Sequence, residues 1–242
     1  MSILVSQQGF TYGDDFTQRR DTVEKLLHLV VSHRVVHVRG TPTSGKTVLS
    51  RMLYTHILEQ KEYIPIYITW KLLGNSDRSK THWLSYLCDN NLISEGSFWH
   101  QHKVIFVLDE AQLSYQETSF WVECIKSQKN NSSGPRFVLF SSFGSASRIA
   151  LKIPGSSPID LDPYQRVSLF PGPHGVSLYF TFEECKDLCK SITRNRGFSV
   201  HEDVLQHLFT LTNGHPGLFQ GIFKALIDRE ASACSSKYYC FK

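Results

Sequence analysis

Two glycines, a lysine and a threonine stand at a spacing that suits phosphate binding. The stretch Gly40-Thr41-Pro42-Thr43-Ser44-Gly45-Lys46-Thr47 follows a β-prone run at 35–38 and opens a helix-like run at 48–59. Glycines at both ends let backbone N–H groups curl around a phosphate, and the helix N-terminus adds partial positive charge. We expect Lys46 to reach the β- and γ-phosphates of a nucleotide and the Thr47 hydroxyl to hold Mg²⁺.

Strand, turn and helix around G-x-x-x-x-G-K-T are the context that the P-loop motif requires, and this context disfavours a glycine turn that binds nothing. The chain contains no N-K-x-D guanine motif, so we expect ATP and Mg²⁺ as cofactors. The expected nucleotide-binding residues are the loop and the position after it: Gly40, Thr41, Pro42, Thr43, Ser44, Gly45, Lys46, Thr47 and Val48.

Two carboxylates follow a second landmark. Residues 104–108 are five consecutive apolar residues, which is typical of a strand buried on both faces of a parallel sheet, and they lead into Asp109 and Glu110. Ligands of open α/β sheets lie at the carboxyl ends of the strands. We therefore expect Asp109 to hold the Mg²⁺ shell and Glu110 to orient and polarise an attacking water. A solvated acidic turn is the alternative interpretation.

The next buried strand, at 136–140, ends in Ser141 and Ser142. Either hydroxyl could bond the γ-phosphate or the attacking water, which completes an expected catalytic set of Lys46, Glu110, Ser141 and Ser142. Serines that merely satisfy the end of a strand are an equally good interpretation, because their hydroxyls readily bond nearby backbone groups.

The pattern around these groups predicts an α/β fold, with a parallel sheet covered by helices and a small C-terminal helical lid. Apolar periodicity predicts helices over 21–32, 81–89, 117–126, 181–192, 201–210 and 216–227 and further strands over 64–70 and 165–170. Thr181 and Glu184 form a capping-box pattern. The Pro- and Gly-rich run at 171–175 suggests a boundary. The expected domains are residues 1–33, a P-loop core at 34–172 and the lid at 173–242.

Composition narrows the class of protein. The 242 residues are 41% hydrophobic and 20% charged, with a net charge of +4 that permits nucleic-acid contact without indicating it. Six cysteines without C-x-x-C spacing read as reduced thiols. Neither a signal peptide nor an apolar run of membrane-spanning length is visible. We expect an intracellular, cytoplasmic protein; nuclear residence or delivery into a host cell stays open.

The motifs together resemble ATPases of the AAA+/STAND type. Phe16-x-x-Arg19 is similar to the adenine-side box of that group, and Gly214-His215-Pro216 is similar to the G-x-P motif of its lid. The resemblance implies that Arg19 and Pro216 contact the nucleotide, and that a protein partner or effector domain is coupled to nucleotide state. Residues 39–50 and 108–115 further resemble the ATPase region of fungal Crinkler-type proteins. The sensor strand departs from the pattern, because serines stand where STAND proteins carry an arginine.

The expected function is therefore slow, Mg²⁺-dependent ATP hydrolysis that controls a switch. Asp109-Glu110-Ala111-Gln112 also suggests a helicase-like ATPase stimulated by nucleic acid, although the region after residue 173 looks too short and helical for a second motor domain. A small-molecule kinase would not need the sensor strand and lid. A nucleotide-binding interaction module without turnover is a further alternative.

Overall fold

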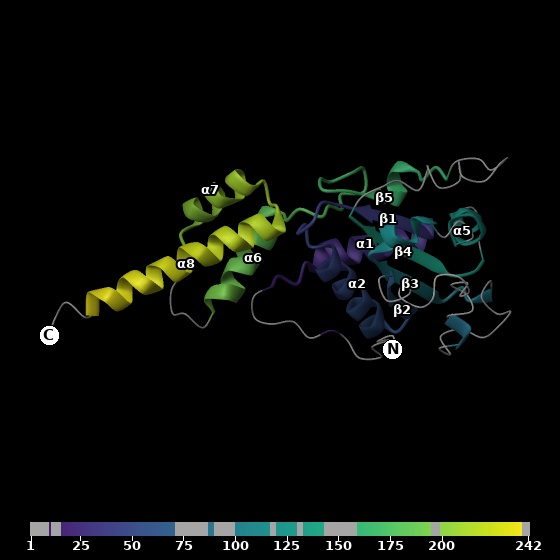
Figure 1. The fold of residues 1–242 in the computed structure, drawn as a ribbon, viewed down its shortest axis with the longest axis horizontal. Helices are drawn as coiled ribbons and strands as arrows, with labels where there is room; N and C mark the ends of the chain where they lie inside the picture. Colours follow the sequence, from purple (N-terminus) through teal and green to yellow (C-terminus); the bar gives the residue numbers. More distant parts are fainter. Residues whose placement is uncertain are drawn as a thin grey trace. The chain divides into compact units, whose positions relative to one another are not determined.

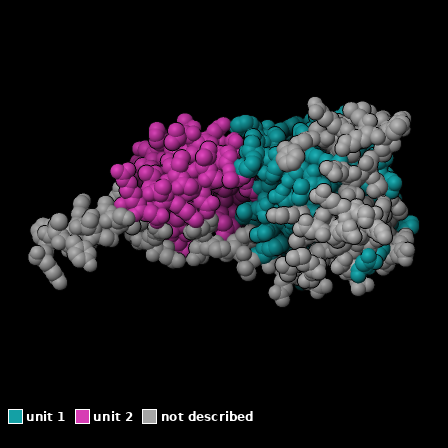
Figure 2. Space-filling model, viewed as in Figure 1, with its two compact units in different colours: residues 1–10, 20–42, 46–178 teal, residues 11–19, 43–45, 179–242 magenta. Residues whose placement is uncertain are grey.

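The computed structural model describes residues 10, 16–70, 87–89, 100–116, 120–129, 133–142, 159–194 and 199–238. The chain forms two compact units (Figure 2). The core unit comprises residues 1–10, 20–42 and 46–178, and the helical unit comprises residues 11–19, 43–45 and 179–242. We call residues 40–47 the phosphate loop, after its expected role. Its tip, residues 43–45, clusters with the helical unit, whereas the residues on either side of the tip belong to the core unit.

A five-stranded parallel sheet organises the core unit, with strand order β2-β3-β4-β1-β5 (Figure 1). The strands are β1 (Val35–Arg39), β2 (Ile64–Thr69), β3 (Val104–Asp109), β4 (Arg136–Ser141) and β5 (Arg166–Val167). Because all strands run the same way, the loop after β1 and the ends of β3 and β4 lie along one edge of the sheet. The expected parallel α/β fold is confirmed.

Every residue of β3 is buried, which explains the unbroken apolar run at 104–108 before Asp109. Alternate side chains point to opposite faces of the sheet. On one face, Phe106 and Phe137 stack with ring centroids 5.2 Å apart and join a cluster with Phe120 and Trp121. α1 (Arg20–His33) and α2 (Lys46–Gln60) pack against each other and against the strands.

Short helical segments follow the strands. They are η2 (Ala111–Gln116), η3 (Phe120–Lys126), α5 (Ser127–Lys129) and η6 (Pro163–Gln165). η3 is a π-helix, within the region expected to be an α-helix from residue 117. The strand expected over 165–170 is shorter, because η6 takes residue 165 and only 166–167 pair with β1. Most of the helix expected over 81–89 lies outside the described residues.

In the described part of the helical unit there are three helices: α6 (Phe182–Thr193), α7 (Glu202–Thr212) and α8 (Pro216–Tyr238). Their shared core is apolar and includes Cys185, Leu188, Leu205, Leu208, Phe219 and Phe223. The predicted capping box is confirmed, since Thr181 accepts from the Glu184 N–H and Glu184 accepts from the Thr181 N–H. No helix within the described ranges is long and apolar enough to cross a membrane.

The turn between α7 and α8 depends on Gly214. Its φ of +71° favours glycine, and a Cβ there would lie 2.4 Å from the carbonyl oxygen of Phe180. The Phe180 N–H donates to the Gly214 carbonyl at 2.8 Å. α8 begins at Pro216, as expected. A larger residue in place of Gly214 would displace the backbone of the turn between α7 and α8.

Candidate functional site

The phosphate loop begins at the sheet edge and ends at the first turn of α2. The Gly40 N–H donates to the carbonyl of Ser141 at 3.2 Å, which ties the start of the loop to the end of β4. Thr43 and Gly45 both have positive φ, +61° and +83°. Positive φ at these positions turns the backbone sharply ahead of Lys46, the first residue of α2, as a loop that curls around an anion requires.

Lys46 lies folded back on this loop. Its Nζ donates to the carbonyls of Gly40 at 3.0 Å and Thr41 at 2.6 Å, and the residue is only 8% exposed. Burial lowers the pKa of Lys46, while the carboxylates of Glu110 and Asp109 act to raise it. The ammonium therefore stands within electrostatic reach of the acidic pair.

Asp109 is the buried carboxylate of the site, 4% exposed. Burial raises its pKa, while hydrogen bonds from the Thr47 side chain and the Glu110 N–H act to lower it. The Glu110 N–H lies 3.0 Å from Oδ1, and the Tyr67 hydroxyl donates to Oδ2 at 3.3 Å. The two residues expected to hold a metal, Thr47 and Asp109, are thus brought into contact.

This pair fits Mg²⁺ that arrives with a nucleotide. Among the residues that the structure describes, no three His, Cys, Asp or Glu side chains gather into a metal site of their own. Mg²⁺ commonly takes one or two carboxylates and fills its other positions with phosphate oxygens and water. A hydroxyl and a buried carboxylate beside a phosphate loop are the oxygen donors that such a site needs.

Glu110 has a backbone conformation that is uncommon for its residue type, with φ of +56°. Its Oε2 accepts a hydrogen bond from Nε2 of Gln112. The Gln112 side chain also accepts, through Oε1, from the N–H of Ser142 at 2.9 Å. The expected general base is therefore connected through one amide to the end of β4.

The two serines at the end of β4 differ. Ser141 is fully buried, and its Oγ lies 2.7 Å from Nε2 of His37 and 3.4 Å from the Tyr115 hydroxyl. Burial, together with the charges of Arg39 and Arg166, lowers the pKa of His37 to about 3. Ser141 thus belongs to a neutral buried cluster, whereas Ser142 is partly exposed. A contact of either hydroxyl with the γ-phosphate stays a prediction.

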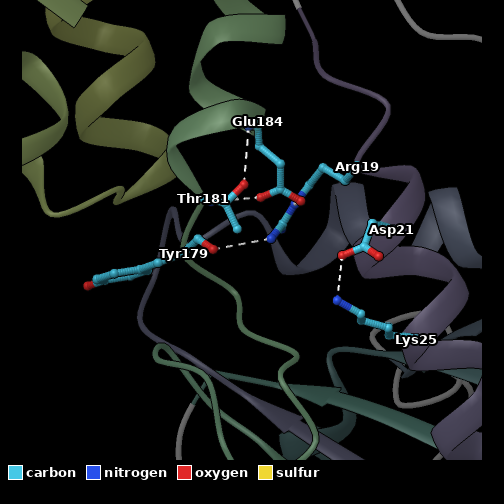
Figure 3. Close-up of polar contacts among 6 residues, drawn as sticks. All are labelled: Arg19, Asp21, Lys25, Tyr179, Thr181 and Glu184. Carbon is cyan, nitrogen blue, oxygen red and sulfur yellow. Dashed lines mark hydrogen bonds and ion pairs between the residues drawn. The ribbon is translucent and has the colours of Figure 1, made fainter. Parts of the chain in front are cut away.

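Arg19 lies in the helical unit, where it is 5% exposed. Figure 3 shows its side chain beside Glu184 and Tyr179. Its Nε pairs with Oε1 of Glu184 at 3.1 Å, and a terminal nitrogen donates to the carbonyl of Tyr179 at 3.3 Å. The guanidinium also lies 5.1 Å from the ring centroid of Phe180. Arg19 thereby joins the segment before α1 to the start of α6, and its contact with adenine stays a prediction.

The start of α8 touches the tip of the phosphate loop within the helical unit. The Gly217 N–H donates to the carbonyl of Thr43 at 3.2 Å, and a Cβ on Gly217 would lie 2.8 Å from the Cβ of Thr43. A Cβ on Gly45 would lie 3.6 Å from two ring carbons of Pro216. The residues Pro216 and Gly217 therefore lie against the tip of the loop.

The sequence alone did not reveal three of these contacts. Tyr67 reads as an apolar strand residue, Gln112 reads as part of a helicase-like tetrapeptide, and Gly217 reads as a poor residue for the first turn of a helix. That poor helix propensity was the one available signal, since a glycine inside a helix usually has a packing reason.

Two solved structures have a similar fold. A Walker-type ATPase of Pyrococcus abyssi is 14% identical with a TM-score of 0.51, over 98% of this chain and 77% of that chain. AMPPCP-bound DnaA from Aquifex aeolicus is 12% identical with a TM-score of 0.50, over 93% of this chain and 66% of that chain. The chain has the α/β P-loop fold. No protein-family model and no curated protein sequence matches the chain.

Proposed function

We propose that this protein binds ATP with Mg²⁺ at residues 40–48, hydrolyses it slowly and uses the bound nucleotide as a switch. One observation carries the proposal: the Lys46 ammonium, held on loop carbonyls, stands within electrostatic reach of Asp109 and Glu110, while Thr47 bonds Asp109. A phosphate-binding cation, a pair of metal-binding oxygens and a base are the parts that phosphoryl transfer to water requires.

Lys46 can exchange its partners when a triphosphate arrives. Its present acceptors, the carbonyls of Gly40 and Thr41, carry no net charge. Phosphate oxygens carry negative charge, so they add Coulomb attraction to the hydrogen bonds of the ammonium, which a neutral carbonyl cannot do. The ammonium therefore moves from the loop carbonyls to the β- and γ-phosphates, and it stabilises the charge that develops as the terminal phosphoryl group leaves.

Asp109 and Thr47 would hold Mg²⁺, which supplies neutralisation of the phosphate charge when it is bound. The Tyr67 hydroxyl supports this arrangement through its hydrogen bond to the Asp109 carboxylate. Burial, together with the negative charge of Asp109, raises the pKa of Tyr67 to about 12. Tyr67 therefore stays a hydrogen-bond donor to Asp109 across the physiological range of pH and orients the carboxylate for its ligand.

Glu110 orients the attacking water and accepts its proton. It follows Asp109 directly at the end of β3, and its side chain is partly exposed, so that water can approach it. The positive φ of Glu110 is the kind of strain that persists where the surrounding structure holds a functional residue in place. Proton transfer to a positioned carboxylate contributes about 10²–10⁴-fold to the rate of such a reaction.

The switch lies in the contact between the loop tip and α8. Thr43 and Gly45 change their surroundings when phosphate enters the loop, and both lie against Pro216 and Gly217. The position of α8 therefore depends on whether a nucleotide phosphate occupies the loop. The resemblance to STAND and Crinkler-type ATPases supports an output through a protein partner or an effector domain.

The test compares Glu110→Gln with wild type and with the matched control Glu59→Gln, which changes an exposed glutamate of α2. Glu110→Gln should keep Mg²⁺-dependent ATP binding and lose about 10²-fold in phosphate release, the scale of a missing general base. Nucleotide that co-purifies with Glu110→Gln, identified by mass, should be ATP. Equal turnover in all three proteins would refute hydrolysis through Glu110, and stimulation by single-stranded DNA would favour the helicase-like alternative.

A further inference from the structure

Gln112 makes two hydrogen bonds whose directions are fixed by chemistry. A backbone N–H can only donate, so the atom that receives the Ser142 N–H at 2.9 Å must be the carbonyl oxygen Oε1. The nitrogen Nε2 is then the atom that faces Oε2 of Glu110. The orientation of the amide is therefore settled by its partners, and the carboxylate of Glu110 receives a donor.

The segment that carries Gln112 is firmly held. η2 begins directly after Glu110, and Oγ of Ser114 donates to the carbonyl of Ala111 at 2.6 Å. The indole N–H of Trp121 contacts Oγ of Ser114 at 2.9 Å, and Trp121 is fully buried. Gln112 itself is 7% exposed. A side chain on such a support can hold a neighbour in one geometry, which a loosely packed glutamine could not do.

We propose that Gln112 is a positioning residue for ATP hydrolysis. It holds the Glu110 carboxylate through Oε2 of Glu110, so that Oε1 of Glu110 can accept from the attacking water. It also joins this carboxylate to Ser142 at the end of β4. The inference rests on the proposed function of Glu110. A glutamate side chain has several rotatable bonds, and ordering them costs conformational entropy. When the side chain is fixed before the reaction, the chemical step does not bear this cost. A shift of Ser142 on nucleotide binding is passed to Glu110 through the same amide.

A purely structural role for Gln112 is the competing explanation, because the Ser142 N–H needs an acceptor. Two substitutions separate the explanations. Gln112→Glu keeps an acceptor for Ser142 but replaces the donor to Glu110 with a second carboxylate. Gln112→Leu removes both bonds at similar volume. Only the positioning role requires the donor, so Gln112→Glu distinguishes between the two.

The experiment measures kcat and KM for ATP with the full chain, for both variants and for the control Gln60→Glu at the exposed end of α2. Gln112→Leu and Gln112→Glu should each lower kcat about 10-fold or more, with KM within about 2-fold, because the loss concerns the general base and not binding. In the Glu110→Gln background, Gln112→Leu should add less than about 2-fold, since residues that act through one another are not additive.

Several results would overturn the inference: wild-type kcat in Gln112→Glu, a higher kcat in Gln112→Leu, or a full additional loss in the Glu110→Gln background. Thermal melts show whether Gln112→Leu is folded, and Gln112→Glu gives the answer if it is not. The proposed function fails separately, if wild type does not hydrolyse ATP or if Glu110→Gln has wild-type turnover. The inference then falls with it.

Discussion

Lys46 and Arg19 are both long basic side chains that are almost completely buried, one in each unit, yet their partners differ. Lys46 donates to two backbone carbonyls, whereas Arg19 pairs with the carboxylate of Glu184. A neutral carbonyl is readily replaced by a phosphate oxygen, but a buried ion pair that loses one partner leaves an uncompensated charge. We therefore expect an exchange of partners to cost less free energy for Lys46 than for Arg19.

His37 shows a third way to bury a base. It is 2% exposed and bonds Ser141, with a pKa lowered to about 3 by burial and by the charges of Arg39 and Arg166. It therefore stays neutral and needs no carboxylate. Lys46 should therefore affect the affinity for ATP, the Arg19–Glu184 pair the stability of the fold, and His37 the dependence of stability on pH.

The largest effect is expected for Glu184→Ala. The substitution removes the carboxylate that pairs with buried Arg19 and the bond that the Thr181 N–H donates to it, so the free energy of unfolding should fall by about 3–5 kcal/mol. The matched control is Glu183→Ala in the same turn, whose exposed pair with Lys186 should contribute little to stability because water screens it. Denaturant unfolding measures both, and equal losses would show that the Arg19–Glu184 pair carries no special weight.

Lys46→Ala should lower ATP affinity about 100-fold or more, since two charge-assisted hydrogen bonds to phosphate contribute about 1.5–3 kcal/mol each. Its melting temperature should stay close to that of wild type, because the lost acceptors are carbonyls at the loop surface. Titration with Mg²⁺-ATP measures the affinity, with the exposed Lys103→Ala as control. Retained affinity would contradict the role of Lys46 at the phosphates.

The contrast also separates what the sequence predicts from what it does not. The turn before α2, the strand that ends at Asp109 and the capping box are local patterns, and neighbouring residues predict the structure of each. The partner of Arg19 lies 165 positions away, and the bond from His37 to Ser141 spans 104 positions. Periodicity tells which face of an element is buried but not which element covers it, so the pairing of Arg19 with Glu184 could not be predicted from the sequence. The contact of Arg19 with adenine stays a prediction.

Stability should depend on pH through His37. The folded pKa of about 3 lies below the unfolded value of 6.5, so between these values the unfolded chain binds the proton and stability falls as pH falls. From pH 7 to pH 5 the loss attributable to His37 is about 2 kcal/mol, at 1.36 kcal/mol per pH unit below the unfolded pKa.

Unfolding measured across this range checks the expectation. His37→Gln should show a shallower dependence than wild type, and His102→Gln, at an exposed position, should match wild type. A slope that is the same in all three proteins would mean that His37 titrates normally in the folded state.

The smallest effect concerns the contact between α8 and the loop tip, and Gly217 and Gly221 form a matched pair within one helix. A Cβ on Gly221 meets nothing within 4 Å, so Gly221→Ala should stabilise the protein by about 0.5–1 kcal/mol through helix propensity. A Cβ on Gly217 would lie 2.8 Å from the Cβ of Thr43 and 2.9 Å from its carbonyl oxygen.

Gly217→Ala must therefore move either α8 or the loop, at a cost of about 1 kcal/mol or more that offsets the gain in propensity. Because the displaced residue belongs to the phosphate loop, ATP affinity should fall several-fold in Gly217→Ala and stay unchanged in Gly221→Ala. Thermal melts with and without Mg²⁺-ATP measure both quantities. If Gly217→Ala and Gly221→Ala stabilise the protein equally and leave the affinity for ATP unchanged, α8 does not constrain the loop. The proposed coupling of nucleotide binding to α8 would then be wrong.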